Sequence, residues 1–575
     1  MRQFIYSLFP ARSMRRKLVK KILRKSHLYH PILGGYYNTW AHQLYNTLPL
    51  RSGEKIHDEP LISIVVPAYN TTPTYFYELI YSIVSQAYTN WELIIVNASN
   101  NKKLKDLISN SSQIDTRIRV IPFPNQGIAK NTNRGIKAAK GDYVAFVDHD
   151  DILDTFALYE VAKVIEDQEV DLIYSDEDKI SADGNFYYDP HFKPDWSPDL
   201  LTHVNYINHL TVVKMSILKK VNALDPTKDG AQDYDLILKL TDESNRIYHI
   251  PKVLYHWRAA ENSTATNFSS KRNITNVGTR ALQEHFRRKK VNIKVKAKED
   301  SPGFYNIQAI PAKEISLIIT PFTTDALLRL YVELILKKTN RNKTNLEVII
   351  PIGAEPHQNF KNCKIISLPT GSEFLSAAIN KAQNENTIII NQILFPYQKD
   401  WLERFSGLLC LDHIAAVAPI VLKGGVMIED CGLVKSANGA LSPLFVNQVY
   451  PNNQTYLGNT GWVRNVNALS GDFVFVRKRE LADFIKEYGL GTSSQQLLKE
   501  YTLNQADKGK YNVVFSDVPF DNYSIRIKSP NQGSTFFNDN LIMVGTALEI
   551  YTSETVAINI LFELQEQESS KDVTK

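Results

Sequence analysis

The region up to Leu153 alternates short apolar runs with stretches of helical spacing, and no other feature restricts the fold as strongly. The apolar runs are "LISIVV", "WELIIV", "RIRVI" and "YVAFV". Runs of this length, bounded by polar or turn residues, are typical of buried strands. Because they alternate with helices, we predict an α/β fold with a Rossmann-like, mostly parallel sheet.

The fourth apolar run leads directly into acidic residues. "YVAFVDHDD" places Asp148, Asp150 and Asp151 within four residues. Parallel sheets bind ligands beyond the carboxyl ends of their strands, so we expect these acids to face a ligand. Neighbouring carboxylates raise one another's pKa, and a divalent cation such as Mg²⁺ or Mn²⁺ relieves the conflict and can bridge to phosphate. A solvated acidic turn is the alternative interpretation.

The second half of the chain repeats the first in the same order. "ISIVVPAYNTT" is echoed by "ISLIITPFTTD", "WELIIVNAS" by "LEVIIPIGA", and "GIAKNTNRGIKAAKGDYVAFV" by "GSEFLSAAINKAQNENTIIIN". Shared order and similar spacing predict a duplication. We therefore expect a basic amphipathic N-terminal segment (1–54), a first α/β domain (55–300), a degenerate second copy (301–535), and a C-terminal helix and tail (536–575).

Composition excludes several classes of protein. The chain has 575 residues, 43% of them hydrophobic, which is enough for more than one core. A net charge of +5 is too small for a protein that coats nucleic acid. Its three cysteines form no CxxC pair, so we expect neither a disulfide framework nor a cysteine zinc site. A reducing, cytoplasmic compartment fits best.

Positive charge is concentrated at the N-terminus. Residues 1–30 hold nine Lys or Arg and no acid, and the first acid is Glu54. Leu18, Ile22 and Leu23 alternate with these basic residues, which predicts an amphipathic helix on an anionic membrane surface. A solvated basic tail is the alternative. We predict neither a secretory signal nor a transmembrane helix, because no apolar run is long enough.

Three further motifs complete a recognisable set. They are "VPAYN" (66–70), "GAQDYDL" (230–236) and "YHIPKVLYHWR" (248–258). With the acidic motif, and in this order, they resemble bacterial family-2 glycosyltransferases with a GT-A fold. "YSDEDKI", "FKPDWSPDLL" and "NYINHLTV" narrow the resemblance to enzymes that build rhamnose-containing and other surface polysaccharides. In that subgroup a "PGFY"-like joint leads into a second GT-A unit, as 302–305 does here.

The resemblance implies roles for individual residues. Asp148, Asp150 and Asp151 would form the metal–diphosphate motif, with Mn²⁺ or Mg²⁺ as the cation. Asp233 would be the catalytic base, which takes a proton from the acceptor hydroxyl. His256 would be a further metal ligand, with a packed core histidine as the alternative. The implied donor-binding residues are Pro67, Tyr69, Asn70, Asn97, Asp148 and Arg258.

Two other motifs are expected on the acceptor side. Asp176 and Glu177 in "YSDEDKI" are predicted to line the donor or acceptor pocket, with a surface turn as the alternative. Trp196 lies in the aromatic-rich "FYYDPHFKPDW" and is predicted to stack on acceptor sugars, with ordinary core as the alternative. His249 is expected to belong to the core.

The chain also departs from the family pattern. Asn97 stands where an aspartate usually contacts the base, and Thr132 stands where an arginine is common. An amide still hydrogen-bonds a uracil or thymine edge, but without charge. In the second copy, "TIIINQILFPYQK" has no carboxylate, Ser494 stands opposite Asp233, and Asp521 stands opposite His256. We therefore expect a copy kept for structure, acceptor binding or oligomerisation.

These inferences predict a metal-dependent, inverting hexosyl- or rhamnosyltransferase. It would move sugar from a UDP- or dTDP-linked donor to a lipid-linked or growing cell-surface polysaccharide, at the inner face of the cell membrane. One alternative is a non-catalytic glycan-binding or scaffold partner of another glycosyltransferase. Another is a sugar nucleotidyltransferase, but that class needs a Gly-rich phosphate loop, and "VPAYNTTPT" offers none.

Overall fold

The computed structural model describes residues 37, 38, 41, 55–258, 268–298, 301–436, 438–451, 457–489 and 493–522. The predicted N-terminal amphipathic helix and the C-terminal helix and tail lie outside these residues. The described residues form two compact units, the first mainly from residues 55–290 and the second mainly from residues 307–451 and 460–522. No helix within the described ranges is both long enough and apolar enough to cross a bilayer.

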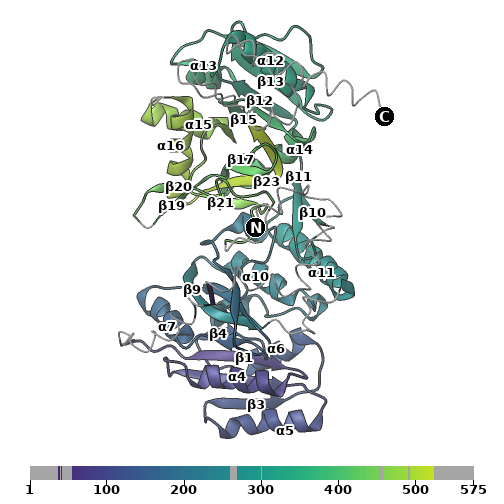
Figure 1. The fold of residues 1–575 in the computed structure, drawn as a ribbon, viewed down its shortest axis with the longest axis vertical. Helices are drawn as coiled ribbons and strands as arrows, with labels where there is room; N and C mark the ends of the chain where they lie inside the picture. The colour runs from purple at the N-terminus through teal and green to yellow at the C-terminus, as the bar shows by residue number, and fades with distance from the viewer. Residues whose placement is uncertain are drawn as a thin grey trace, which may run out of the picture. The chain divides into compact units, whose positions relative to one another are not determined.

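The first unit is built on one nine-stranded sheet (Figure 1). Its strand order is β3-β2-β1-β4-β8-β6-β9-β5, with β7 paired to β6. The strands are β1 (Ile62–Ala68), β2 (Trp91–Asn97), β3 (Ile118–Pro122), β4 (Tyr143–Phe146), β5 (Ile152–Leu153), β6 (Leu172–Ile180), β7 (Tyr187–His191), β8 (Thr211–Lys214) and β9 (Ile247–Arg258). The pairs within β1–β4 and the pair β6–β9 are parallel, whereas β8 is antiparallel to both of its neighbours.

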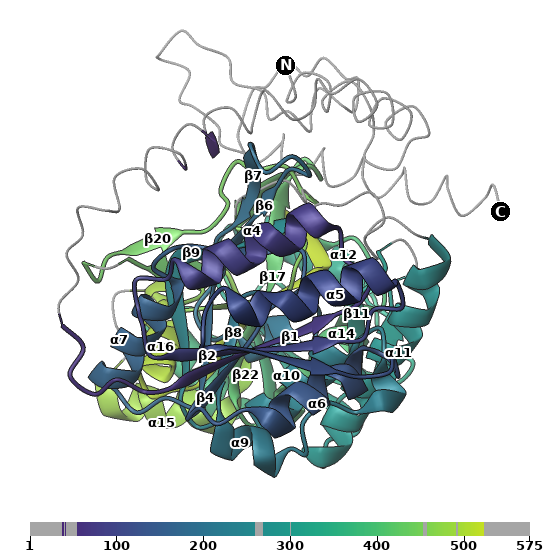
Figure 2. The same ribbon diagram turned by 90° about the horizontal axis from the view of Figure 1, so that it is seen from below.

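Helices cover both faces of this sheet. Figure 2 shows α4 and α5 on one face of β1 and β2, and α6 on the other. The helices of the unit are α4 (Pro73–Val84), α5 (Lys102–Asn110), α6 (Ile128–Ala138), α7 (Ala157–Asp167), α8 (Pro198–Leu201), α9 (Met215–Lys220), α10 (Gln232–Glu243) and α11 (Phe268–Arg288). Because both faces are covered, the central strands β1 and β2 are mostly apolar, and every residue of β2 is buried.

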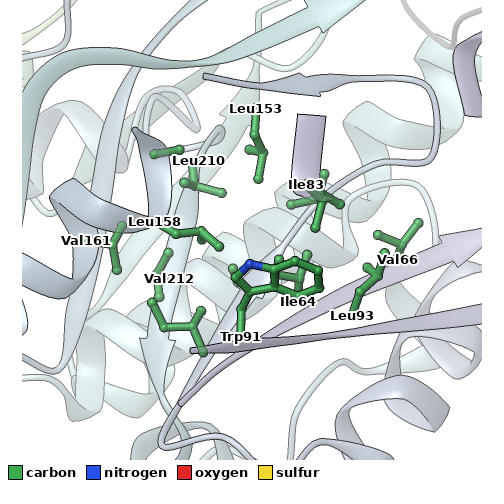
Figure 3. Close-up of a cluster of buried hydrophobic side chains, with 14 of the residues drawn as sticks. Ile64, Val66, Ile83, Trp91, Leu93, Leu153, Leu158, Val161, Leu210 and Val212 are labelled. Atoms are coloured by element: carbon green, nitrogen blue, oxygen red, sulfur yellow. The ribbon is translucent and has the colours of Figure 1, made fainter. Parts of the chain in front are cut away.

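Side chains from most strands and several helices of the unit form a core on one side of the sheet. Trp91 of β2 packs there with residues of β1, α4, β5, α7 and β8 (Figure 3). The residues labelled in that figure are Ile64, Val66, Ile83, Trp91, Leu93, Leu153, Leu158, Val161, Leu210 and Val212. This core fixes the strands at their centres, so the polar residues beyond the carboxyl ends are held in a rigid frame.

The second unit repeats the topology of the first. Its strand order is β14-β13-β12-β15-β22-β17-β23-β16, with β18 paired to β17, and each pair has the same parallel or antiparallel sense as its counterpart. These strands are β12 (Glu314–Ile319), β13 (Asn345–Pro351), β14 (Cys363–Leu368), β15 (Asn386–Ile390), β16 (Leu394–Pro396), β17 (Ile414–Lys423), β18 (Met427–Asp430), β22 (Phe473–Arg477) and β23 (Tyr511–Asn522). The predicted fold class, an α/β unit followed by a second copy, is confirmed.

The remaining elements of the described chain are short strands and five helices. The strands are β10 (Ile293–Ala297), β11 (Tyr305–Ala309), β19 (Leu433–Lys435), β20 (Leu441–Pro443) and β21 (Arg464–Val466). The helices are α12 (Asp325–Lys337), α13 (Phe374–Lys381), α14 (Trp401–Ser406), α15 (Lys478–Tyr488) and α16 (Ser494–Asp507).

A buried hydrogen bond is repeated in both units. Ser63 Oγ donates to Glu92 at 2.7 Å, and Ser316 Oγ donates to Glu347 at 2.8 Å. In each unit the same carboxylate also accepts a backbone N–H, from the turn after α6 in the first unit and from the turn after α13 in the second. The serine and the glutamate hold the same places in the echoed strands. A shared core interaction of this kind supports duplication more strongly than apolar similarity does, because buried polar pairs are uncommon.

Candidate active site

Three polar side chains from separate elements meet at one cavity of the first unit. Asp148 follows β4, His209 precedes β8, and Asp233 lies in the first turn of α10. Since β8 runs antiparallel to β4, with Thr211 opposite Phe146, its start lies beside the end of β4. All three residues line a cavity of about 110 Å³. Its remaining walls are mostly apolar and include Val65, Pro67, Ile128, Phe146, Leu224, Leu236 and Ile237.

Asp233 is held by two amide side chains. Asn208 Nδ2 donates to Asp233 Oδ2 at 2.7 Å, and Asn205 Nδ2 lies 3.4 Å from the same oxygen. Burial raises the pKa of Asp233, and the nearby Asp148 adds to the rise. A carboxylate with a raised pKa is a stronger proton acceptor once it is ionised. The position and environment of Asp233 therefore suit a general base.

The loop that precedes α10, the helix of Asp233, is hydrogen-bonded to α6. Asp229 Oδ1 accepts a hydrogen bond from the backbone N–H of Ala129 at 3.0 Å. Gly127 precedes that helix with φ of +96°, and a Cβ placed on it would lie 2.0 Å from Asp229 Oδ2. Both the backbone conformation and the close approach require glycine. This contact fixes the loop before α10 against the first turn of α6.

The three acids of the "DHDD" motif have different surroundings. The side chains of Asp148 and Asp150 are 47% and 28% exposed, so both reach solvent. Asp151 is buried, and it accepts hydrogen bonds from Tyr255 Oη at 2.5 Å and from the backbone N–H of Arg258 at 2.8 Å. Burial, followed by the charges of Asp148 and Asp150, raises the pKa of Asp151. Asp151 thus anchors the motif to β9.

A histidine that the motif analysis missed lies beside Asp148. His209 Nε2 is 3.8 Å from Asp148 Oδ2, and its ring stacks on Tyr255 with 4.7 Å between centroids. Burial opposes a charge on this imidazole, but hydrogen bonding and attraction to Glu177 outweigh it, and the pKa of His209 rises to about 9. His209 is therefore a cation at neutral pH, next to the acidic motif.

Glu177 is the centre of a buried charge network. Its Oε2 accepts the backbone N–H of His209 and lies 3.6 Å from Nζ of the fully buried Lys193 side chain. Burial opposes ionisation of Glu177, but Lys193, His191 and His209 lower its pKa well below the usual range. Lys193 Nζ also donates to the carbonyls of Ile207 and His209. The network fixes the backbone that presents His209.

The other two acids of "SDED" also bind histidines. Asp176 Oδ1 lies 2.9 Å from His249 Nε2, and Asp178 Oδ1 lies 2.6 Å from His256 Nδ1. Both histidines are buried, and attraction to the paired carboxylate raises the pKa of each imidazole despite the opposing effect of burial. The histidine beside the acidic motif is thus His209, and His256 faces Asp178.

Only some of the residues predicted to bind the nucleotide-sugar donor lie at this cavity. Pro67 lines the cavity, and the side chain of Tyr69 is exposed nearby on the chain. Asn70 has φ of +49°, and its side chain accepts the N–H of Asn100. Asn97 is buried and donates to the carbonyl of Lys105 at 3.1 Å. Asn70 and Asn97 therefore shape the loops after β1 and β2.

Arg258 and Trp196 lie away from the cavity that Asp233 lines. The Arg258 side chain is fully buried, with hydrogen bonds from Nε to the carbonyl of Asp150 at 2.8 Å and from Nη2 to Glu78. Its guanidinium also lies 4.5 Å from the ring centre of Tyr75. Trp196 lines a second, separate cavity. Arg258 therefore supports the backbone of the acidic motif at Asp150.

The residues that motif analysis missed lie close together in the sequence. Asn205, Asn208 and His209 all belong to "NYINHLTV", which precedes the short strand β8. This stretch contributed to the family resemblance, but the resemblance assigned no role to its individual polar residues. They reach the cavity because β8 enters the sheet antiparallel beside β4, and that pairing was not deducible from local pattern.

The side chains of this site can hold a divalent cation only together with oxygen atoms from a bound ligand. Within the described ranges, no group of three or more His, Cys, Asp and Glu side chains is arranged to hold a metal. Mg²⁺ is commonly bound through one or two carboxylates together with substrate phosphates and water. Asp148 and Asp150 supply two carboxylates that reach solvent. The donor set therefore suits a cation that arrives with a diphosphate.

The second unit has different side chains at the equivalent positions. Strand register places Asn391 at the position of Asp148, Leu394 at that of Asp151, and Asp472 at that of His209. Burial raises the pKa of Asp472 to about 6, and Gln495 Nε2 donates to its Oδ1 at 2.6 Å. The site of the first unit is thus not reproduced.

Comparison with known proteins identifies the family of this chain. The family described as "Glycosyl transferase family 2" matches residues 63–221. An uncharacterized glycosyltransferase of Methanocaldococcus jannaschii is 30% identical over 242 residues, which cover 82% of that protein and 40% of this chain. The chain belongs to glycosyltransferase family 2. Its first unit carries the matched region, including the acidic motif.

Other relatives are longer or more distant. The O-antigen biosynthesis protein RfbC of Myxococcus xanthus is 29% identical over 440 residues, 74% of this chain and 34% of that protein. The chain spans about a third or less of the length of the first curated relatives it matches. A mannosyltransferase from Pyrobaculum calidifontis, solved with GDP-Man and Mn²⁺, is 16% identical with a TM-score of 0.32, covering 48% of this chain and 76% of that one.

Proposed function

We propose that the first unit transfers a sugar from a nucleotide-sugar donor to an acceptor glycan, with inversion at the anomeric carbon. The observation that carries the proposal is the single cavity shared by Asp148 and Asp233. We assign Asp148 to the diphosphate and Asp233 to the acceptor hydroxyl. The domain boundaries 55–300 and 301–535 are proposed with it.

Asp233 acts as the base. It takes the proton of the acceptor hydroxyl while that oxygen bonds to the anomeric carbon and the bond from this carbon to the diphosphate oxygen breaks. Asn208 and Asn205 fix the orientation of one carboxylate oxygen. A single displacement from the face opposite the leaving group inverts the configuration.

Asp148 and Asp150 would hold the diphosphate through a divalent cation, and His209 would contact it directly. A divalent cation bound with the donor supplies charge stabilisation for the departing diphosphate. The two carboxylates would hold that cation, while Asp151 keeps the motif in place through Tyr255 and the Arg258 backbone. The protonated His209 adds positive charge at the same edge of the cavity. Arg258 supports the backbone of the acidic motif at Asp150, and His256 is paired with Asp178.

The substrate class follows from the resemblance and from one relative. The donor is proposed to be UDP- or dTDP-linked, and the transferred sugar a hexose or rhamnose. The acceptor is proposed to be a lipid-linked or growing surface polysaccharide, in line with the O-antigen biosynthesis named for the relative in Myxococcus xanthus. The second unit, which lacks a counterpart of Asp233, is proposed to bind acceptor or to mediate oligomerisation.

The proposed function is tested with a panel of nucleotide sugars. The full-length protein is incubated with UDP- and dTDP-linked hexoses and dTDP-rhamnose, with and without Mn²⁺, and release of nucleoside diphosphate is followed by mass spectrometry. We expect one donor to be consumed, and only when Mn²⁺ or Mg²⁺ is present. Binding of glycan without consumption of any donor would favour the non-catalytic alternative.

Membrane attachment is proposed from the basic segment, which the structure does not describe. Removing residues 1–30 deletes nine Lys or Arg and should release the protein from vesicles that contain phosphatidylglycerol. High salt should weaken binding of the full chain, because it screens charge. Sedimentation with neutral vesicles serves as the control, and equal binding by the truncated protein would contradict the proposal.

A further inference from the structure

A second cavity in the first unit lies outside the proposed donor site. Its volume is about 330 Å³. The lining includes two aromatic side chains, Trp196 and Tyr248, and four polar ones, Gln168, Thr241, Asn245 and Arg246. The mechanism proposed above uses none of these residues for donor binding or proton transfer.

The cavity lies at the opposite ends of the strands that carry the charge network. β6 and β9 run parallel, with Leu172 opposite Ile247 and Asp178 opposite His256. The cavity is lined by residues 168–170 and 244–248, which adjoin the amino ends of these strands. A strand rises about 3.3 Å per residue, so the cavity lies roughly 25 Å from the carboxyl ends. Its lining shares no residue with the cavity of Asp233, although Thr241 lies only eight positions after Asp233 on α10, about 12 Å at a rise of roughly 1.5 Å per residue.

The lining suits a neutral ligand with both apolar faces and hydroxyl groups. Trp196 and Tyr248 offer ring faces, while Gln168 and Asn245 offer both donors and acceptors. Arg246 is paired with Glu169, which neutralises its charge and makes the cavity a poor anion site. An acyl chain would leave the amides unpaired, at a cost in free energy. Saccharide rings match this combination of aromatic and amide groups.

One segment connects this cavity with the charge network. Residues 191–197 run beside β6 toward its amino end. The Lys193 N–H donates to Asp176 Oδ1 at 2.7 Å. Nearer the amino end of β6, Tyr174 Oη donates to the carbonyl of Pro194 at 2.7 Å. The Ser197 N–H then donates to Tyr206 Oη. These bonds fix the backbone on both sides of Trp196, so its ring is presented from a rigid support.

We propose that this cavity is a second saccharide site, which holds sugars of the acceptor polysaccharide away from the point of transfer. The inference rests on the proposed function, because it takes the ligand to be the acceptor glycan. It assigns Trp196 to the acceptor, as the sequence predicts, but at a cavity other than the one that Asp233 lines. Such a site retains a long acceptor between successive transfers and so favours long glycans over short ones.

The test measures binding of defined tetrasaccharides by saturation-transfer NMR and tryptophan fluorescence. The probes are linear tetrasaccharides of rhamnose, glucose, galactose and N-acetylglucosamine, added to the full-length protein. We expect at least one to bind, and we expect Trp196→Ala and Tyr248→Ala each to weaken that binding tenfold or more. Trp196→Phe keeps a ring face and should retain most of it, which separates loss of stacking from misfolding.

The controls distinguish this site from the transfer site. Tyr81→Ala removes an aromatic side chain that is 76% exposed on α4, and it should leave tetrasaccharide binding unchanged. Asp233→Asn should also bind the tetrasaccharide normally. If no donor is consumed but Trp196-dependent binding persists, the proposed function fails and the saccharide site stands. No binding of any tetrasaccharide, or binding unaffected by Trp196→Ala, would overturn the second site.

Discussion

Asp233→Asn is expected to lower sugar transfer by about 10²–10⁴-fold, the usual contribution of a general base. The amide keeps the shape of the carboxylate but cannot accept the acceptor's proton. Donor affinity should change by no more than a few fold, because Asp148 and Asp150, not Asp233, are assigned to the diphosphate. Single-turnover transfer and calorimetry with the nucleoside diphosphate and Mn²⁺ measure the two effects separately.

Asp235→Asn is the matched control. Asp235 lies one position beyond Tyr234 in the same helical turn, but it is buried and paired with Lys239 at 2.9 Å, and it does not line the cavity. The same change of charge there should cost some stability and leave the rate of transfer within a few fold. Transfer at the parent rate by Asp233→Asn would refute the base assignment. Lost donor binding would instead place Asp233 at the donor.

The fold could be predicted because its signals are local. The first four strands of the first unit are short, mostly apolar runs, and the repeat keeps Ser and Glu at the same places in the echoed strands. Those residues form the same buried hydrogen bond in both units. The α/β class and the duplication could therefore be predicted from the order of short apolar runs along the chain.

The site was harder to predict, because its composition depends on pairing between distant segments. Asp148 and Asp233 were identified as motif residues, and the cavity brings them together. His209, which lies beside Asp148, gave no signal because its place depends on the antiparallel entry of β8. In contrast, Arg258 stood in a strong motif, yet its guanidinium binds Glu78 and backbone carbonyls.

Neighbouring acids of one motif also proved physically different. Sequence treats Asp148, Asp150 and Asp151 alike, whereas burial separates the last from the other two. A pattern shows which side chains are present. It does not show which of them turn inward, because that depends on the partners Tyr255 and Arg258, which lie on β9 more than a hundred positions away.

This difference within the motif leads to opposite expectations for two substitutions. Asp150→Asn should lower transfer by roughly 10²-fold or more, because the cation's stabilisation of the diphosphate is worth several kcal/mol. Binding of nucleoside diphosphate in the presence of Mn²⁺ should weaken in parallel. The fold should be retained or slightly stabilised at neutral pH. Burial raises the pKa of Asp150, as does Asp148, so the ionised form is disfavoured in the folded state and its removal relieves that cost.

Asp151→Ala should act mainly on stability. It leaves the Tyr255 hydroxyl and the Arg258 backbone N–H without the acceptor they have now, and each unsatisfied buried group costs about 1–3 kcal/mol. We expect a lower melting temperature for Asp151→Ala and an unchanged one for Asp150→Asn, measured by calorimetry without nucleotide. If Asp150→Asn bound nucleoside diphosphate and Mn²⁺ as the parent does, the cation would not be held by this carboxylate. If Asp151→Ala melted like the parent but lost Mn²⁺-dependent binding, the inward acid would be the ligand, and its two hydrogen bonds would have to break when the donor binds.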